Sequence, residues 1–124
     1  MNIPVNIVVD RNTTLALPMV DQFVAKAGLD SVITPARAME LVNENTLLIV
    51  TDTHKKDFCE VPQLVDKCKK IMVIDHHRKS VGFIENTVLF YHRPNSSSAS
   101  EILFFRCRRY VTLFACRIYP FRYL

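Results

Sequence analysis

The stretch KKIMVIDHHRK, residues 69–79, decides the fold of this chain. Within it, a short apolar run rich in β-branched residues ends at Asp75, His76 and His77. A run of this kind with polar ends predicts a buried strand of a parallel sheet. Ligands of open α/β sheets collect at the carboxyl ends of strands. We therefore expect these three residues to lie at a functional edge, and a charged loop after a core strand is the alternative.

A second strand ends with the same chemistry. Residues 46–51, TLLIVT, are followed directly by Asp52. Neighbouring parallel strands lie about 4.8 Å apart, so Asp52 and His76 can share a divalent cation of the manganese or zinc type. Two such ions about 3.5–4 Å apart would activate a water and hold phosphoryl oxygens. The simpler alternative is that Asp52 only caps the following turn.

The remaining residues of the stretch have expected roles of their own. Asp75 or a backbone carbonyl can orient the His76 ring. His77 points elsewhere and can meet a substrate phosphate or protonate a leaving oxygen. Arg78 offers a guanidinium, which suits a phosphate.

Other polar residues have simpler interpretations. His54 is interpreted as a solvated loop residue, and His92 as a structural residue. Ser98-x-x-Glu101 matches a capping box that starts a helix. A helix N-terminus at Ser98 also suits a phosphate.

Strands and helices alternate along most of the chain. The expected strands are 3–9, 30–33, 46–51, 71–74 and 87–91, and the expected helices are 15–27, 35–42, 62–68 and one starting at Ser98. This alternation predicts an α/β fold, a mostly parallel Rossmann-like sheet with flanking helices.

Composition excludes several classes of protein. The 124 residues are enough for one domain, and no apolar run reaches the ~18 residues of a membrane span. The N-terminus has no basic leader, which predicts a cytoplasmic chain. The four cysteines form no C-x-x-C pair, so we expect free thiols, with Cys59 and Cys68 packing among apolar residues. Five arginines of residues 103–124 carry the charge of +4, and removing them leaves −1 for residues 1–102. That balance argues against duplex nucleic acid as a partner.

The last 22 residues differ from the rest. They hold four of the eight phenylalanines and three of the four tyrosines, and no Lys, Asp or Glu. We expect a domain at 1–102 and an atypical basic and aromatic tail at 103–124, as a change of reading frame would produce. A native basic amphipathic helix is the alternative.

Residues 33–58, 61–79 and 82–103 resemble the DHH phosphoesterase superfamily, and most of all its membrane-tethered cyclic-di-AMP phosphodiesterases of Gram-positive bacteria. The resemblance rests on DTH at 52–54, IDHHR at 74–78, and the FIEN and SSSASE elements that follow. It implies that Asp52 bridges two manganese ions and that His76 binds the second ion. It further implies that Asp75 supports His76, that His77 contacts the scissile phosphate, and that Arg78 faces the phosphate.

The chain also departs from that family. A motif of one His and two aspartates should precede residue 1, and a last metal-binding aspartate should follow the helix begun at Ser98. A second, substrate-gripping domain is expected further along. The resemblance thus implies a partial DHH domain, inactive without its upstream and downstream halves. Family members are often dimeric, and their membrane-tethered parents hold this domain in the cytosol.

The expected activity is manganese-dependent hydrolysis of a cyclic dinucleotide, cyclic-di-AMP. Two alternatives remain open. One is an oligoribonuclease or phosphoadenosine-phosphate phosphatase of the same superfamily, with a short oligonucleotide as substrate. The other is a nucleotide-binding module without catalysis.

Overall fold

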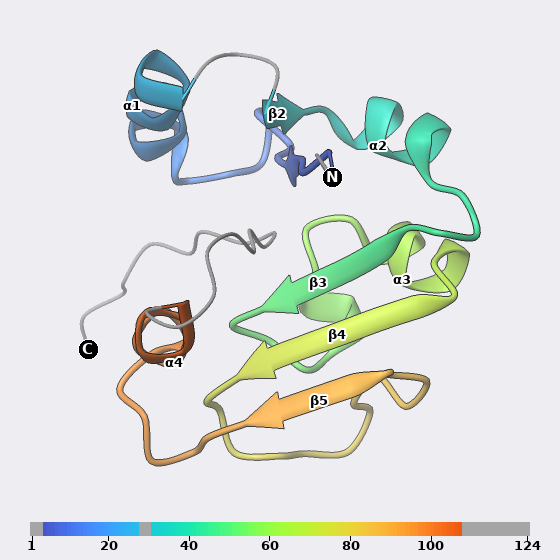
Figure 1. The fold of residues 1–124 in the computed structure, drawn as a ribbon, viewed down its shortest axis with the longest axis vertical. Helices are drawn as coiled ribbons and strands as arrows, with labels where there is room; N and C mark the ends of the chain where they lie inside the picture. The colour runs from blue at the N-terminus through green and yellow to red at the C-terminus, as the bar shows by residue number, and fades with distance from the viewer. Residues whose placement is uncertain (1–3, 28–30, 108–124) are drawn as a thin grey trace.

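A computed structural model describes residues 4–27 and 31–107 of the chain (Figure 1). In chain order its elements are β1 (Ile7–Val8), α1 (Leu17–Ala27), β2 (Val32–Ile33), α2 (Pro35–Leu41), β3 (Leu47–Thr51), the short 3-10 helix η2 (Lys56–Phe58), α3 (Pro62–Lys67), β4 (Lys70–Asp75), β5 (Leu89–His92) and α4 (Ala99–Cys107). The predicted α/β fold with parallel strands is confirmed. The first two strands are shorter than expected, at two residues each.

The strands form two parallel sheets rather than one. β3, β4 and β5 make a three-stranded sheet in that order, and β1 pairs with β2 in a smaller one. Thr51 lies opposite Ile74, and Asp75 lies opposite His92. The predicted pairing of the strands before Asp52 and Asp75 is therefore confirmed, and all three strands of the larger sheet end at one edge.

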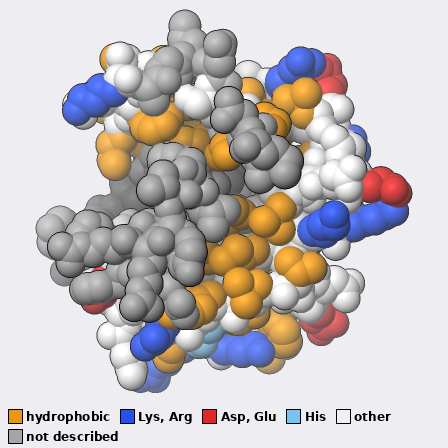
Figure 2. Space-filling view, viewed as in Figure 1, with side chains coloured by type: hydrophobic (Ala, Val, Ile, Leu, Met, Phe, Trp, Pro, Cys, Tyr) orange, Lys and Arg blue, Asp and Glu red, His pale blue; other side chains and the backbone are white. Residues whose placement is uncertain are grey.

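Both faces of the larger sheet are packed. One face contributes Val50, Ile71 and Val73 to a buried cluster with Cys68, which follows α3. On the other face Ile49 and Ile74 contact Ile102 of α4, and Figure 1 shows this helix beside the carboxyl ends of the strands. Figure 2 shows hydrophobic side chains gathered on the viewed face, and β3 and β5 begin with exposed leucines. Because α4 packs at the strand ends, it helps to enclose the functional edge.

Capping residues set the helix starts, including the start that the sequence predicts at Ser98. Thr34 Oγ1 accepts a hydrogen bond from the Arg37 backbone N–H at 3.2 Å, with Pro35 at the first helical position. Ser98 Oγ accepts one from the Glu101 N–H at 3.1 Å. The Glu101 carboxylate accepts from Ser97 instead of Ser98, through the backbone N–H at 2.6 Å and the hydroxyl at 2.9 Å. In a standard capping box the Glu101 carboxylate would accept from the backbone N–H of the N-cap Ser98, and here it accepts from the residue before it.

α4 continues to Cys107, so the boundary predicted at residue 102 falls inside a helix. Residues 108–124, which make up most of the predicted tail, lie outside the described residues. Within residues 4–27 and 31–107, no helix combines the length and the apolar character that crossing a bilayer demands.

Leu64 of α3 belongs to a buried cluster with Val8 of β1 and Ala38 of α2, and Leu48 of β3 packs against this cluster, which thus links the small sheet to the large one. Leu64 is only 3% exposed. Leu64→Ala should lower the free energy of unfolding by about 2–5 kcal/mol, because it removes buried methyl groups and leaves a cavity. Urea unfolding followed by circular dichroism measures this loss. Leu41→Ala is the matched control, since Leu41 is 42% exposed and should change stability by only about 0.5 kcal/mol. Equal losses for the two variants would contradict this account of the core.

Candidate metal centre

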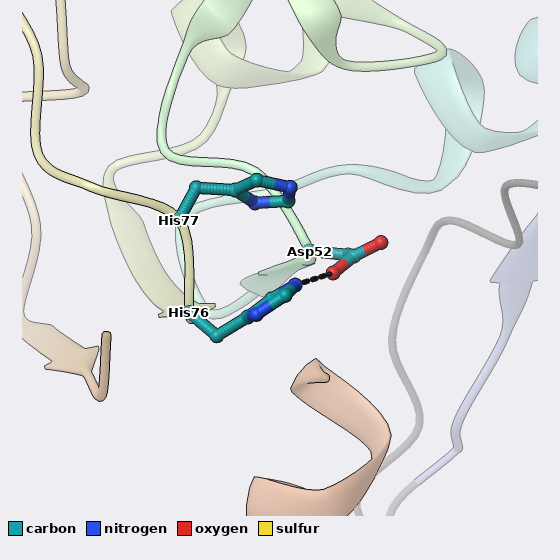
Figure 3. Close-up of side chains that lie close together, drawn as sticks. All are labelled: Asp52, His76 and His77. Carbon is teal, nitrogen blue, oxygen red and sulfur yellow. Dashed lines mark ion pairs between the residues drawn. The ribbon is translucent and has the colours of Figure 1, made fainter. Parts of the chain in front are cut away.

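Asp52, His76 and His77 meet at the edge where β3 and β4 end (Figure 3). One ligand atom from each residue lies within 4.8 Å of the others. Carboxylate oxygen and imidazole nitrogen together suit Mn²⁺, Fe²⁺ and Zn²⁺. The donor set fits one divalent cation with three protein ligands.

The backbone at Asp52 is unusual and places its carboxylate. Asp52 has φ of +63°, and among the described residues no other apart from glycine has a positive φ. Aspartate tolerates this left-handed conformation better than most side chains do. The Asp52 N–H still donates to the Ile74 carbonyl at 2.9 Å, which continues the sheet by one residue. The chain then turns sharply, and the carboxylate lies over the end of β4.

His76 presents one ring nitrogen to Asp52. Its Nδ1 lies 3.2 Å from the Ser96 carbonyl oxygen, so Nδ1 carries a proton and donates. Its Nε2 lies 3.2 Å from Asp52 Oδ1. An unprotonated Nε2 and a carboxylate oxygen both offer lone pairs, so a cation or a proton between them satisfies both. This geometry supports the predicted pairing of Asp52 and His76.

Of the two partners expected to orient the His76 ring, the structure has the backbone carbonyl and not Asp75. Asp75, which the family resemblance implied, accepts only the His76 backbone N–H, at 2.9 Å. The ring donates to the backbone carbonyl oxygen of Ser96, in the loop before α4. The reason is the alternation of side chains along an extended chain, which sends Asp75 into the core and His76 toward α4.

Asp75 is the buried centre of the network, with 0% exposure. Oδ1 accepts from the His77 ring Nδ1 at 2.7 Å and from the backbone N–H groups of His76 and His77. Oδ2 accepts from Nδ1 of His54. Burial acts to raise the pKa of Asp75, but the hydrogen bonds from His54 and His77 outweigh it and lower that pKa below its ordinary value. Asp75 is therefore held as a carboxylate.

His77 was expected to point away from the metal residues, and that expectation is wrong. Its ring centroid lies 4.4 Å from that of His76, and one of its nitrogens belongs to the cluster with Asp52. The side chain is 54% exposed, so it also faces solvent. The Asp75 carboxylate causes this orientation by binding Nδ1. His77 can therefore contact a metal ion or a bound phosphate from the same position.

His54 is the site residue that the sequence interpretation missed. It was expected to be a solvated loop residue, but it is only 4% exposed. The turn at Asp52 folds the chain back, so Thr53 and His54 are both buried. The available signal was the position of a histidine two residues after the aspartate of a strand end, in DTH.

The remaining predicted residues lie around this edge. Arg78 is exposed, and its guanidinium makes no hydrogen bond or ion pair with the described residues. Ser98 is the N-cap of α4, two residues beyond the carbonyl that holds His76. The Glu101 carboxylate occupies the same helix start. The His92 Nε2–H donates to the His77 carbonyl oxygen, which agrees with a structural role for His92.

Comparisons with known proteins match this chain to one family and to several proteins. Residues 7–117 match the model of the DHH family, N-terminal domain. The chain is 45% identical over 71 residues to the cyclic-di-AMP phosphodiesterase GdpP of Bacillus subtilis (strain 168), which covers 57% of this chain and 11% of that protein. It is 37% identical over 75 residues to the cyclic-di-AMP phosphodiesterase PdeA of Listeria monocytogenes serotype 1/2a (strain 10403S), which covers 60% of this chain and 11% of that protein.

A third relative has a different description. It is a membrane protein-large ribosomal subunit bL9 fusion protein of Onion yellows phytoplasma (strain OY-M), 31% identical over 90 residues, which covers 70% of this chain and 10% of that protein. The chain thus spans about a tenth of the length of these relatives. The matched family model covers most of the chain, in agreement with the α/β fold and the DHH sequence at the end of β4. The chain belongs to the DHH family, and it matches that family's N-terminal domain.

Proposed function

We propose that this chain is the metal-binding part of a manganese-dependent phosphodiesterase that hydrolyses cyclic-di-AMP. The single observation that carries the proposal is the cluster of Asp52, His76 and His77 at the strand ends of a DHH domain. Two relatives that are named as cyclic-di-AMP phosphodiesterases support the choice of substrate. Mixed carboxylate and imidazole ligands are compatible with manganese, and the resemblance to the DHH phosphoesterases favours it over iron and zinc.

Each residue of the edge has a distinct part in this proposal. Asp52 and the Nε2 of His76 would hold the metal, which would supply an activated water and neutralise phosphoryl charge. His77 contacts the scissile phosphate, because its ring is fixed beside His76 and faces solvent. Asp75 keeps that ring in place. Arg78 and Ser98 are proposed to bind the phosphates of the substrate, Arg78 through its exposed guanidinium.

The number of metal ligands limits what the chain does alone. Within the described residues, a single group of this kind supplies three ligand atoms. A site with two metal ions needs about three protein ligands for each ion. We therefore propose that the remaining ligands and the substrate-gripping contacts come from the larger protein that the relatives represent. Cys59 and Cys68 are thiols and not half-cystines, which supports a reducing compartment such as the cytosol.

The test compares the chain alone with a chimera. In the chimera, this chain's segment replaces the matched 71 residues of Bacillus subtilis GdpP. With Mn²⁺, the chain alone should hydrolyse cyclic-di-AMP no faster than buffer, because a partial ligand set binds the ion weakly. The chimera should show manganese-dependent turnover, measured by chromatography of the products.

Other outcomes would point elsewhere. A folded but inactive chimera would favour a nucleotide-binding module without catalysis. A chimera that prefers short oligoribonucleotides over cyclic-di-AMP would favour the oligoribonuclease alternative. Turnover by the chain alone that stops on adding a chelator would mean that the 124 residues already hold a complete site.

A further inference from the structure

His54 joins two loops beneath the metal cluster. It follows β3 at a distance of three residues, and its ring is buried between Asp75 at the end of β4 and Ser80 in the next loop. No substrate could reach this ring, because the side chain is almost fully enclosed. Its role must therefore act through its neighbours.

The hydrogen bonds of His54 fix its tautomer. The backbone N–H of Ser80 donates to Nε2 at 3.3 Å. A backbone N–H cannot accept, so Nε2 must carry the lone pair, and the Ser80 hydroxyl at 3.0 Å can also donate to it. Nδ1 then carries the ring proton and donates it to Asp75 Oδ2.

The Asp75 carboxylate is consequently held at both oxygens. Oδ2 is bound by His54, and Oδ1 is bound by the His77 ring. A carboxylate anchored at both ends cannot rotate about its bond to Cβ. It therefore requires Nδ1 of His77 to carry the proton and leaves Nε2 of His77 with its lone pair. Only in this tautomer does Nε2 of His77 have a lone pair with which it can bind a metal ion or accept a proton.

We propose that His54 is a positioning residue, which sets the tautomer of His77 through the Asp75 carboxylate. The proposal rests on the proposed function for its catalytic consequence, since His77 is the group that meets the phosphate there. Its structural part concerns only the described residues. A chain of hydrogen bonds runs from Ser80 through His54 and Asp75 to His77.

The test reads the histidine tautomers directly. Long-range ¹H–¹⁵N NMR correlations of the ¹⁵N-labelled 124-residue chain distinguish a proton on Nδ1 from one on Nε2. In the unaltered chain, His77 should show the Nδ1–H form alone. In His54→Phe, which keeps a ring but loses the donor, His77 should show a mixture of both forms. In His54→Asn it should return to the Nδ1–H form, because the asparagine amide N–H can lie where the Nδ1–H of His54 lies.

Two further variants separate positioning from folding. Leu64 is about as buried as His54 but lies outside the network, and Leu64→Ala should also destabilise the chain, so His77 should keep its single tautomer in that variant. His54→Gln places its amide N–H near the former Nε2, so it should fail where His54→Asn succeeds. If His54→Phe does not fold, the comparison of His54→Asn with His54→Gln decides. An unchanged His77 tautomer in folded His54→Phe, or equal spectra for His54→Asn and His54→Gln, would overturn the proposal.

Manganese gives a second readout. Titration of Mn²⁺ should broaden the His76 and His77 signals of the unaltered chain, and His54→Phe should need on the order of 10–100 times more Mn²⁺ for the same broadening of His77. In the GdpP chimera, His54→Phe should lower kcat with little change in KM, and His54→Asn should restore it. An inactive chimera with unaltered His54 would defeat the proposed function and leave the tautomer result standing. An active chimera indifferent to His54→Phe would defeat the positioning role.

Discussion

Asp52→Asn in the GdpP chimera should lower manganese-dependent hydrolysis of cyclic-di-AMP by about 10³-fold or more. Asp52 is the carboxylate of the cluster, and its Oδ1 lies 3.2 Å from the nitrogen that His76 presents. Loss of a residue that only orients a metal ligand typically lowers affinity or activity about 10–100-fold. Loss of a ligand itself should exceed that range, because the bound ion supplies both the water and the charge stabilisation.

Asparagine is the informative replacement because of the backbone. Asp52 has φ of +63°, a conformation that asparagine also adopts at little cost, whereas alanine would add strain. Asp52→Asn therefore removes the charge without disturbing the turn that buries His54. We expect its thermal unfolding to match that of the unaltered chimera, so that the loss of turnover reports on the metal alone.

Asp57→Asn is the matched control for this experiment. Asp57 lies five residues further along, in η2, and is exposed outside the cluster. It should leave turnover within a factor of about two, as expected for a surface change far from such features. Comparable turnover for Asp52→Asn and Asp57→Asn would mean that Asp52 is not a metal ligand.

The pairing of Asp52 with His76 could be predicted from sequence because it depends on strand order alone. Two apolar runs of strand length, each followed directly by polar residues, must end at one edge once their strands are parallel and adjacent. The observed register, with Thr51 opposite Ile74, confirms this reasoning. The α/β fold and the cap at Ser98 could also be predicted, since each depends on a local pattern of residues.

The network around Asp75 could not be predicted in the same way. Hydrophobic periodicity ends where β3 ends, and the path beyond it depends on a single left-handed residue at position 52. That turn decides whether His54 faces solvent or Asp75. Similarly, a carboxylate between several histidines can bind any of them, and only side-chain rotation selects His54 and His77 over His76. Such choices are made by tertiary packing, which a pattern of residue types does not record.

Asp75→Asn should be the most destabilising single change in the larger sheet, by about 3–5 kcal/mol. The Asp75 carboxylate is fully buried and accepts hydrogen bonds from two imidazoles and two backbone N–H groups. An asparagine would place an amide N–H against one of these donors and would leave that donor unsatisfied in the core. A small domain is stable by about 5–15 kcal/mol, so the urea midpoint should fall by a large fraction, and a chain at the low end of that range should be unfolded without denaturant.

The same carboxylate should make the chain sensitive to acid. The pKa of Asp75 is lowered in the folded state, so its stabilisation is present above its unfolded pKa of about 3.9 and is lost as pH falls through the lower folded value. The unaltered chain should therefore lose stability below about pH 4, measured as the urea midpoint at each pH. The control for the stability loss of Asp75→Asn is Asp66→Asn, since Asp66 forms an exposed ion pair with Lys56 that is worth about 0–1 kcal/mol. A loss of less than about 1 kcal/mol for Asp75→Asn would show that the buried carboxylate does not hold β4 and the histidine loop together.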